Sequence, residues 1–178
     1  YSERNVAAFQ ALAESLSETS RFSETEVLSQ VSLAKQFNLT NREAAKLIAT
    51  SVDLAQVTGK DLNTVVLQLG QTFSGTTGRL SRQFPEIKNL TKAQLENGVA
   101  VDILAKKYKG FAEQGLQTFN GLKAQASNTM ELLKEVLGGA ISDNPAILLV
   151  FREFTDLMRE LIVYVRENKQ AVADFVKD

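Results

Sequence analysis

The fold is set by the stretch DLAQVTGKDLNTVVLQLGQTFSGTTGRLSR, residues 53–82. Gly59 suits the left-handed position that follows a helix end, where other residues meet a Cβ clash. Asp61 predicts the start of a new helix, because a short acidic side chain accepts hydrogen bonds from the first free amides. Apolar residues then recur at three- and four-residue spacing, which predicts one buried helix face. That face comprises Leu62, Val65, Val66, Leu69 and Phe73.

Glycine and proline interrupt the chain after this helix. Gly75 and Gly78 flank two threonines, but the spacing differs from a phosphate-binding loop, and no Lys-Ser/Thr pair follows. We therefore interpret the pair as a turn between helices. Pro85 moves Phe84 out of helical geometry and ends that segment. The predicted turn glycines are Gly59, Gly75, Gly78, Gly98 and Gly110.

Three capping boxes predict further helix starts, at residues 23–26, 40–43 and 91–94. An additional helix is expected over residues 3–18, and another over residues 99–108. Their apolar faces are predicted to form a core. The expected core residues are Val6, Phe9, Ala13, Leu16, Val27, Leu28, Val31, Ala34, Ala44, Leu47, Ile48, Val52, Leu54, Ala55, Ile103 and Leu104.

Residues 111–137 are predicted to form one longer helix that ends at Gly138 and Gly139. Small residues early in its apolar stripe would permit another helix to approach closely. The stripe comprises Ala112, Gly115, Phe119, Leu122, Ala126, Met130, Leu133 and Leu137.

The last predicted helix covers residues 145–176 and carries a seven-residue apolar repeat, which is typical of helix–helix packing. Its apolar face extends beyond a two-stranded seam, which favours packing against two neighbours in a bundle or an oligomer. Asn168 is the polar exception; it either sets the register or marks where the helix leaves its partner. The predicted interface residues are Ile147, Phe151, Phe154, Met158, Leu161, Val165, Val172 and Phe175.

The composition excludes several kinds of chemistry. The 178 residues contain no Cys and no His, which excludes a disulfide framework, His-dependent catalytic triads and the common zinc sites. The carboxylate pairs Glu43/Asp53 and Glu86/Glu96 lack any pattern that distinguishes them from surface charge. We therefore predict no enzymatic activity, no metal and no cofactor. A net charge of −1 predicts no specific nucleic-acid binding.

Neither end of the chain indicates membrane insertion. The longest apolar runs, residues 146–151 and 161–165, are separated by charged residues and are too short to span a bilayer. The first residues lack the apolar core of a signal peptide. Because the chain starts at Tyr1 rather than Met, we expect a fragment or a processed product.

Three pieces of sequence occur in a characteristic order: residues 53–82 quoted above, then IKNLTKAQLENG at 87–98, then VDILAKKYKGFAE at 101–113. This order resembles the glycine-punctuated helical region of tape measure proteins of long-tailed phages. The resemblance covers the middle third of the chain well and the ends more loosely. It implies a structural protein that lies inside the tail tube, sets tail length during assembly in the host cytoplasm, and is expelled before the DNA.

From these observations we predict an all-α protein, a multi-helix bundle of short helices with a long C-terminal heptad-patterned helix. Residues 1–139 would be a helical globular region of tape measure type, and residues 140–178 a helix that packs or oligomerises. The expected partners are further copies of the chain and the tail tube and tail tip proteins, with assembly chaperones as a further candidate; membrane contact is expected only during ejection. The alternatives are a membrane-interacting or peptidoglycan-acting module of the same protein, or a helical scaffold or adaptor domain.

Overall fold

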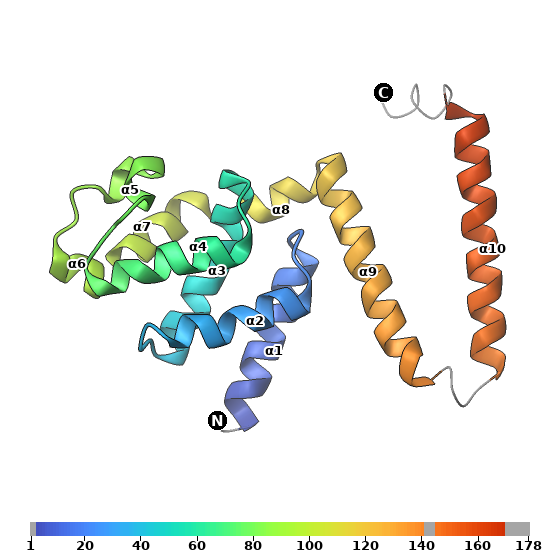
Figure 1. Cartoon of the computed structure of the whole chain (residues 1–178), viewed down its shortest axis with the longest axis horizontal. Coiled ribbons are helices and arrows are strands. Elements are labelled where there is room, and N and C mark those ends of the chain that lie inside the picture. The colour runs from blue at the N-terminus through green and yellow to red at the C-terminus, as the bar shows by residue number, and fades with distance from the viewer. Residues whose placement is uncertain (1–2, 141–144, 170–178) are drawn as a thin grey trace. The chain divides into compact units, whose positions relative to one another are not determined.

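The computed structural model describes residues 3–140 and 145–169, and every regular element in these ranges is a helix (Figure 1). This confirms the predicted all-α class. The chain divides into two compact units, Tyr1–Thr129 and Met130–Asp178. The boundary expected from the sequence, between residues 139 and 140, lies further along the same helix.

The first unit begins with four helices, and the last three of them start at the predicted caps. Ser23 and Asp61 accept hydrogen bonds from the amides of Glu26 and Thr64, at 3.2 and 2.8 Å. Thr40 and Glu43 form the reciprocal bonds of a complete capping box. These helices are α1 (Glu3–Glu18), α2 (Glu24–Lys35), α3 (Asn41–Thr58) and α4 (Leu62–Gly70), and the 3₁₀ turn η1 (Gln71–Ser74) extends α4.

Shorter elements follow in the region that the glycines and proline interrupt. The capping box at Thr91 and Gln94 is complete, as predicted. Pro85 begins a 3₁₀ turn directly after Phe84, which leaves the helical region with φ −126° and ψ 84°. The elements are α5 (Leu80–Gln83), η2 (Pro85–Ile87), α6 (Lys92–Glu96), α7 (Val99–Tyr108), α8 (Phe111–Leu116), α9 (Phe119–Ala140) and α10 (Pro145–Glu167).

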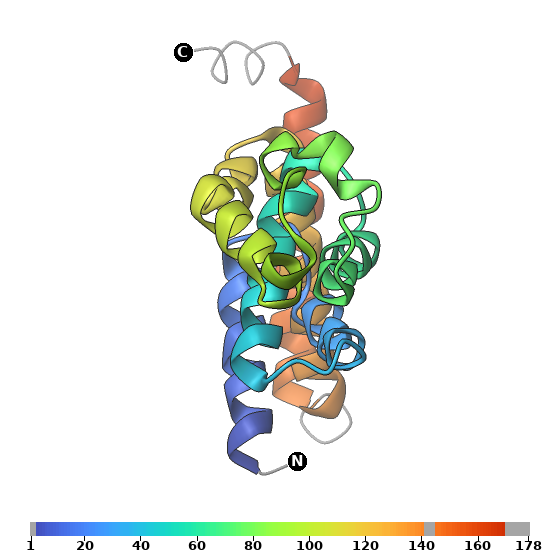
Figure 2. The same cartoon turned by 90° about the vertical axis from the view of Figure 1, so that its left-hand side faces the viewer.

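The core is organised around α3, which packs against α1, α2, α4, α7 and α8. Figures 1 and 2 show α3, in cyan, with these short helices gathered around it. Most of the predicted core residues are buried, but Val6 is exposed, and Phe73 is half-buried in η1, beyond the end of α4. The apolar side chains of α3 without exposed surface are Ala44, Leu47, Ile48, Leu54 and Ala55.

The single helix predicted over residues 111–137 is wrong, because the chain turns between α8 and α9. Thr118 is the cause: its hydroxyl accepts a hydrogen bond from the Gly121 amide at 3.1 Å and donates one to the Gly115 carbonyl at 2.7 Å. The helix restarts behind this cap. At its other end α9 continues to Ala140, so Gly138 and Gly139 lie within the helix and do not end it.

The apolar stripe predicted for α9 does not form its packing face in the first unit. Instead, two side-chain amides of α9 contact the first unit's N-terminal segment. The Gln125 side chain donates to the Glu18 carbonyl at 3.2 Å, and the Asn128 side chain donates to the Arg21 carbonyl at 3.1 Å. Leu122, on the predicted stripe, is 55% exposed. Side-chain amides can satisfy carbonyls near the end of α1, which apolar side chains cannot do.

Close approach of α8 and α9 depends on Gly121. A Cβ at this position would lie 2.2 Å from the Gly115 carbonyl oxygen and 2.7 Å from the Leu116 Cα. Both are backbone atoms, so a side chain cannot move aside to make room. The sequence analysis did not mark Gly121. Of the small residues that it did mark, Gly115 permits a close approach of α3, because a Cβ there would lie 2.1 Å from the Gln56 side chain.

Truncation of the α3 core should be costly. We expect Leu54→Ala to lower the free energy of unfolding by about 2–5 kcal/mol, because the side chain is fully buried. Val57→Ala, on the exposed side of the same helix, should change it by under about 0.5 kcal/mol. Urea unfolding of both variants measures the difference. Equal losses would show that α3 is not buried asymmetrically.

Adding a methyl group at the α8–α9 crossing should also destabilise the protein. Gly121→Ala places its Cβ against backbone, so we expect a loss of about 1–3 kcal/mol on urea unfolding. Ser127→Ala, at an exposed position of α9, should be close to neutral. A stable Gly121→Ala variant would contradict the close crossing.

Candidate functional site

The carboxylates weighed as catalytic candidates each have a separate structural partner. Glu43 belongs to the capping box of α3, where hydrogen bonds from the Thr40 hydroxyl and amide hold the pKa of this carboxyl below its usual value. Glu96 forms a surface ion pair with Lys92, with 3.7 Å between the charged atoms. These contacts give both residues a role at helix termini and surfaces.

Asp53 is half-buried and contacts a neighbouring helix. It lies on α3, and its carboxylate accepts a hydrogen bond from the Ala112 amide at 2.9 Å, at the start of α8. Burial raises the pKa of Asp53, and the amides of Ala112, Gly110 and Phe111 oppose this shift. Asp53 thus caps α8, whose own N-cap residue is Gly110 and has no side chain. The missing local cap before α8 was the signal in the sequence, but it did not identify Asp53 as the acceptor.

Glu86 pairs with Lys107 across 3.0 Å, which joins η2 to α7. Burial opposes the charge on Glu86, yet hydrogen bonds from its own amide, Lys107 and Tyr108 hold its pKa below the usual value. The Tyr108 ring contacts Phe84 and Phe111 edge to face, with centroids 5.2 and 5.6 Å apart. Glu86 is therefore part of the packing between helices.

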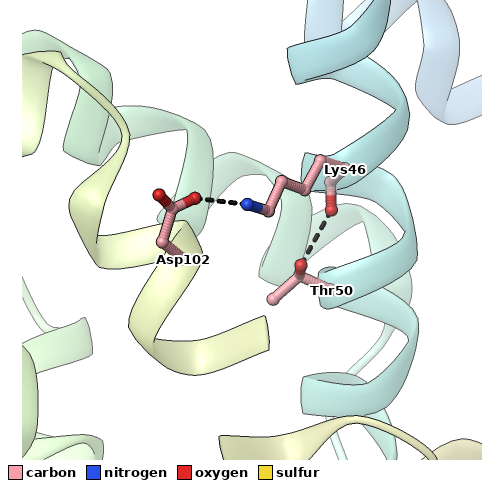
Figure 3. A network of polar contacts seen from close by, with 3 residues as sticks. All are labelled: Lys46, Thr50 and Asp102. Carbon is pink, nitrogen blue, oxygen red and sulfur yellow. Dashed lines mark hydrogen bonds and ion pairs between the residues drawn. The ribbon is translucent and has the colours of Figure 1, made fainter. Parts of the chain in front are cut away.

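A further ion pair connects α3 to α7. Lys46 Nζ lies 2.5 Å from Asp102 Oδ1, and the Thr50 hydroxyl donates to the Lys46 carbonyl one turn along α3 at 2.8 Å (Figure 3). The two charged side chains are 49% and 58% exposed, so solvent screens the pair and its contribution to stability is small. Its effect is to align the two helices.

The five turn glycines have conformational roles. All have φ between +50° and +83°, the left-handed region that glycine adopts without a Cβ clash. At Gly98 the Phe73 ring would also lie 3.0 Å from a Cβ, and at Gly75 the Lys92 side chain would be closer still. Among the described residues, no group of three acidic side chains is placed to hold a metal ion. The described helices also include none that is apolar and long enough to cross a membrane.

The strongest candidate for an interaction surface is the exposed apolar side of α10. Phe154, Leu157, Ile162 and Tyr164 are 38%, 63%, 54% and 60% exposed, and Met158 is half-buried. We call these five residues the α10 face. Of the other predicted interface residues, Ile147, Phe151, Leu161 and Val165 lie on α10, but their side chains are outside the described set. Val172 and Phe175 lie outside the described residues altogether.

Helices of the first unit expose single large apolar side chains, such as Val57 on α3 and Phe111 on α8, whereas α10 exposes several. A soluble helix normally buries its apolar stripe against its own chain. Large exposed apolar patches rimmed by charge are typical of protein–protein contact sites. The sequence-based hypothesis of an interface on this helix therefore stays the best account of the face.

Comparison with known proteins adds no further guide to function: no protein-family model, curated protein or solved structure matches this sequence. The interpretation below therefore depends on the residues themselves and on their arrangement.

The buried carboxylate of Asp53 predicts a pH dependence. Its folded pKa is raised, so its contribution to stability is greatest while it is protonated and falls as pH rises through that pKa. Asp53→Asn keeps an acceptor for the Ala112 amide but does not titrate. Between about pH 4 and about pH 7 the original chain should lose stability as Asp53 ionises, whereas the variant should not. The free energy of unfolding of the variant minus that of the original chain should therefore increase over this range.

Asp61→Asn is the matched control, because hydrogen bonds to Thr64 lower the pKa of Asp61. Its contribution to stability is present above the unfolded pKa of about 4 and is lost as pH falls below that value, so the sign of the slope is reversed and the range must extend down to about pH 2. Urea unfolding across the pH range measures both differences. Slopes of the same sign would contradict the environment assigned to Asp53.

Proposed function

We propose that this chain is a structural, non-catalytic module of a phage tail tape measure protein. The observation that carries the proposal is the order of the three pieces at residues 53–82, 87–98 and 101–113, which resembles the glycine-punctuated region of that family. In the fold these pieces run from the second half of α3 into α8, and all five left-handed glycines lie within them.

The arrangement of helices supports a mechanical role. The candidate carboxylates serve as caps and ion pairs, so the polar side chains of the first unit hold helices in place. An α-helix rises 1.5 Å per residue, which relates the number of residues to a length. In the proposed role, the protein lies in the tail tube lumen, sets the number of tube rings during assembly, and leaves ahead of the DNA.

The α10 face is a second observation that supports the same proposal. An isolated chain gains nothing from leaving Leu157, Ile162 and Tyr164 in water, since burying apolar surface is favourable by about 25 cal/mol per Å². A protein that packs beside copies of itself and against tube and tip proteins would cover such a face. The partners that we propose are therefore further copies, the tail tube and the tail tip.

Tail length provides the test. In the phage that encodes this chain, in-frame removal of residues 145–167 should shorten tails by about 1.5 Å per residue removed, measured by electron microscopy of purified particles. The matched control replaces the same residues with an unrelated helical sequence of equal length, which should leave tail length unchanged. Tails of normal length after the deletion would contradict a role as a ruler for this segment.

A further inference from the structure

The turn between α8 and α9 contains no residue that prevents a continuous helix. Several other helices of the first unit end at a glycine with positive φ or before Pro85, and every residue with positive φ that the structure describes lies before Phe111. Residues 111–140 contain no proline. At the turn, Gln117 stays in the right-handed helical region, with φ −70° and ψ −9°. A helix that continues through this point is therefore sterically allowed.

The hydrogen bonds at this turn are local and replaceable. The amides of Gln117 and Thr118 donate to carbonyls three residues back, at 3.2 and 3.1 Å, and the Gly121 amide donates to the Thr118 hydroxyl at 3.1 Å. In a continuous helix the same amides would donate to carbonyls four residues back. Straightening the chain therefore exchanges these hydrogen bonds one for one and leaves none of the three amides without a partner.

Few contacts hold α9 against the other helices of the first unit. Among the described helices of that unit, none of the extensive helix–helix contacts involves α9. Its hydrogen bonds to the segment around the end of α1 come from the side chains of Gln125 and Asn128. Such bonds contribute little net stability where water can replace them. By contrast, Ala112 and Leu116 of α8 are buried, so α8 is fixed in the core and α9 is free to leave it.

The amino-acid pattern favours a straight helix through the turn. The apolar stripe predicted over residues 111–137 keeps its three- and four-residue spacing across Thr118. In the bent chain this spacing serves no common face, because Ala112 is buried whereas Leu122 is 55% exposed. A conflict between the local pattern and the tertiary contacts brings competing structures close in energy. The bent and straight forms of this segment are therefore competitors.

We propose that residues 111–140 are a two-state element with its hinge at Thr118: the bent form of Figure 1, and one straight helix about 45 Å long. In the bent form the Thr118 hydroxyl caps α9, and Gln125 and Asn128 bind carbonyls near the end of α1. In the straight form α9 continues α8 and leaves those carbonyls to water. The inference concerns the conformations of this chain alone and does not depend on the proposed phage function.

Distances between spin labels distinguish the two forms, and labels can be placed singly because the 178-residue chain has no cysteine. The pair Glu14→Cys and Ser127→Cys reports whether α9 lies against α1. The pair Glu113→Cys and Ser127→Cys reports whether the helix is continuous across the turn. All three positions are exposed. In the straight form the first pair separates, and the backbones of the second pair lie about 21 Å apart. Double electron–electron resonance measures both distances.

Substitutions at the hinge should shift the two populations in opposite directions. Thr118→Ala removes the cap of α9, so the ratio of straight to bent chains should rise about fivefold. Adding Gln125→Ala and Asn128→Ala removes both docking bonds and should make the straight form predominant. Gly121→Ala acts in the same direction, because its Cβ meets backbone only in the bent form. Phe119→Pro has the reverse effect: proline suits the first position of α9 but clashes inside a continuous helix.

Thr129→Ala is the matched control, since it also removes a threonine hydroxyl of α9, one that donates to the Gln125 carbonyl at 3.0 Å away from the turn. It should leave both distances unchanged, and circular dichroism confirms that each variant stays helical. Two results would overturn the inference. Either both pairs keep their original distances in the triple variant, or its first pair separates while the second shows no distance near 21 Å, which would mean that α9 detaches without joining α8. Neither result bears on tail length, so failure here is distinguishable from failure of the proposed function.

Discussion

Burial of α3 on most of its surface is the constraint on which the first unit depends. Eight of its residues are buried, and they include Thr50 and Ser51 as well as the apolar side chains. Its neighbours are short, and isolated helices under about 12–15 residues are only marginally stable in water. Such elements as α4, α7 and α8 therefore persist because each covers part of α3, and the folding of one depends on the presence of the others.

Polar contacts around this core join one helix or loop to the next and so fix their relative positions. They bury little apolar surface. Arg21 is an example: its guanidinium donates to the Lys60 carbonyl at 3.0 Å and lies 4.9 Å from the centre of the Phe22 ring. Its own carbonyl accepts the Asn128 amide from α9. Asp53 connects α3 to the start of α8 in a comparable manner. Loss of such a contact leaves a carbonyl or amide without a partner, which costs more than the contact itself contributes.

The two parts of the chain differ in where their apolar side chains go. In the first unit most of the large apolar side chains pack around α3, whereas Phe154, Leu157, Ile162 and Tyr164 on α10 are exposed. A folded unit joined to a helix of this kind suits a protein that acts by position and association. That difference supports the structural role proposed above.

The sequence by itself determined the all-α class, the caps at Ser23, Thr40, Asp61 and Thr91, and the helix ends at glycines such as Gly59. These features depend on groups within three or four residues of one another, so a short window contains the whole interaction. The phage resemblance and the α10 interface also came from the sequence and stay predictions. Only the tertiary structure decided that Asp53 caps α8, that the chain turns at Thr118, and that α9 packs through Gln125 and Asn128. The partners of Asp53, Gln125 and Asn128 lie 59 or 107 residues away along the chain, so no short window of sequence contains them. The hydrogen bonds of Thr118 are local, but there the cap competes with an apolar pattern that favours a continuous helix.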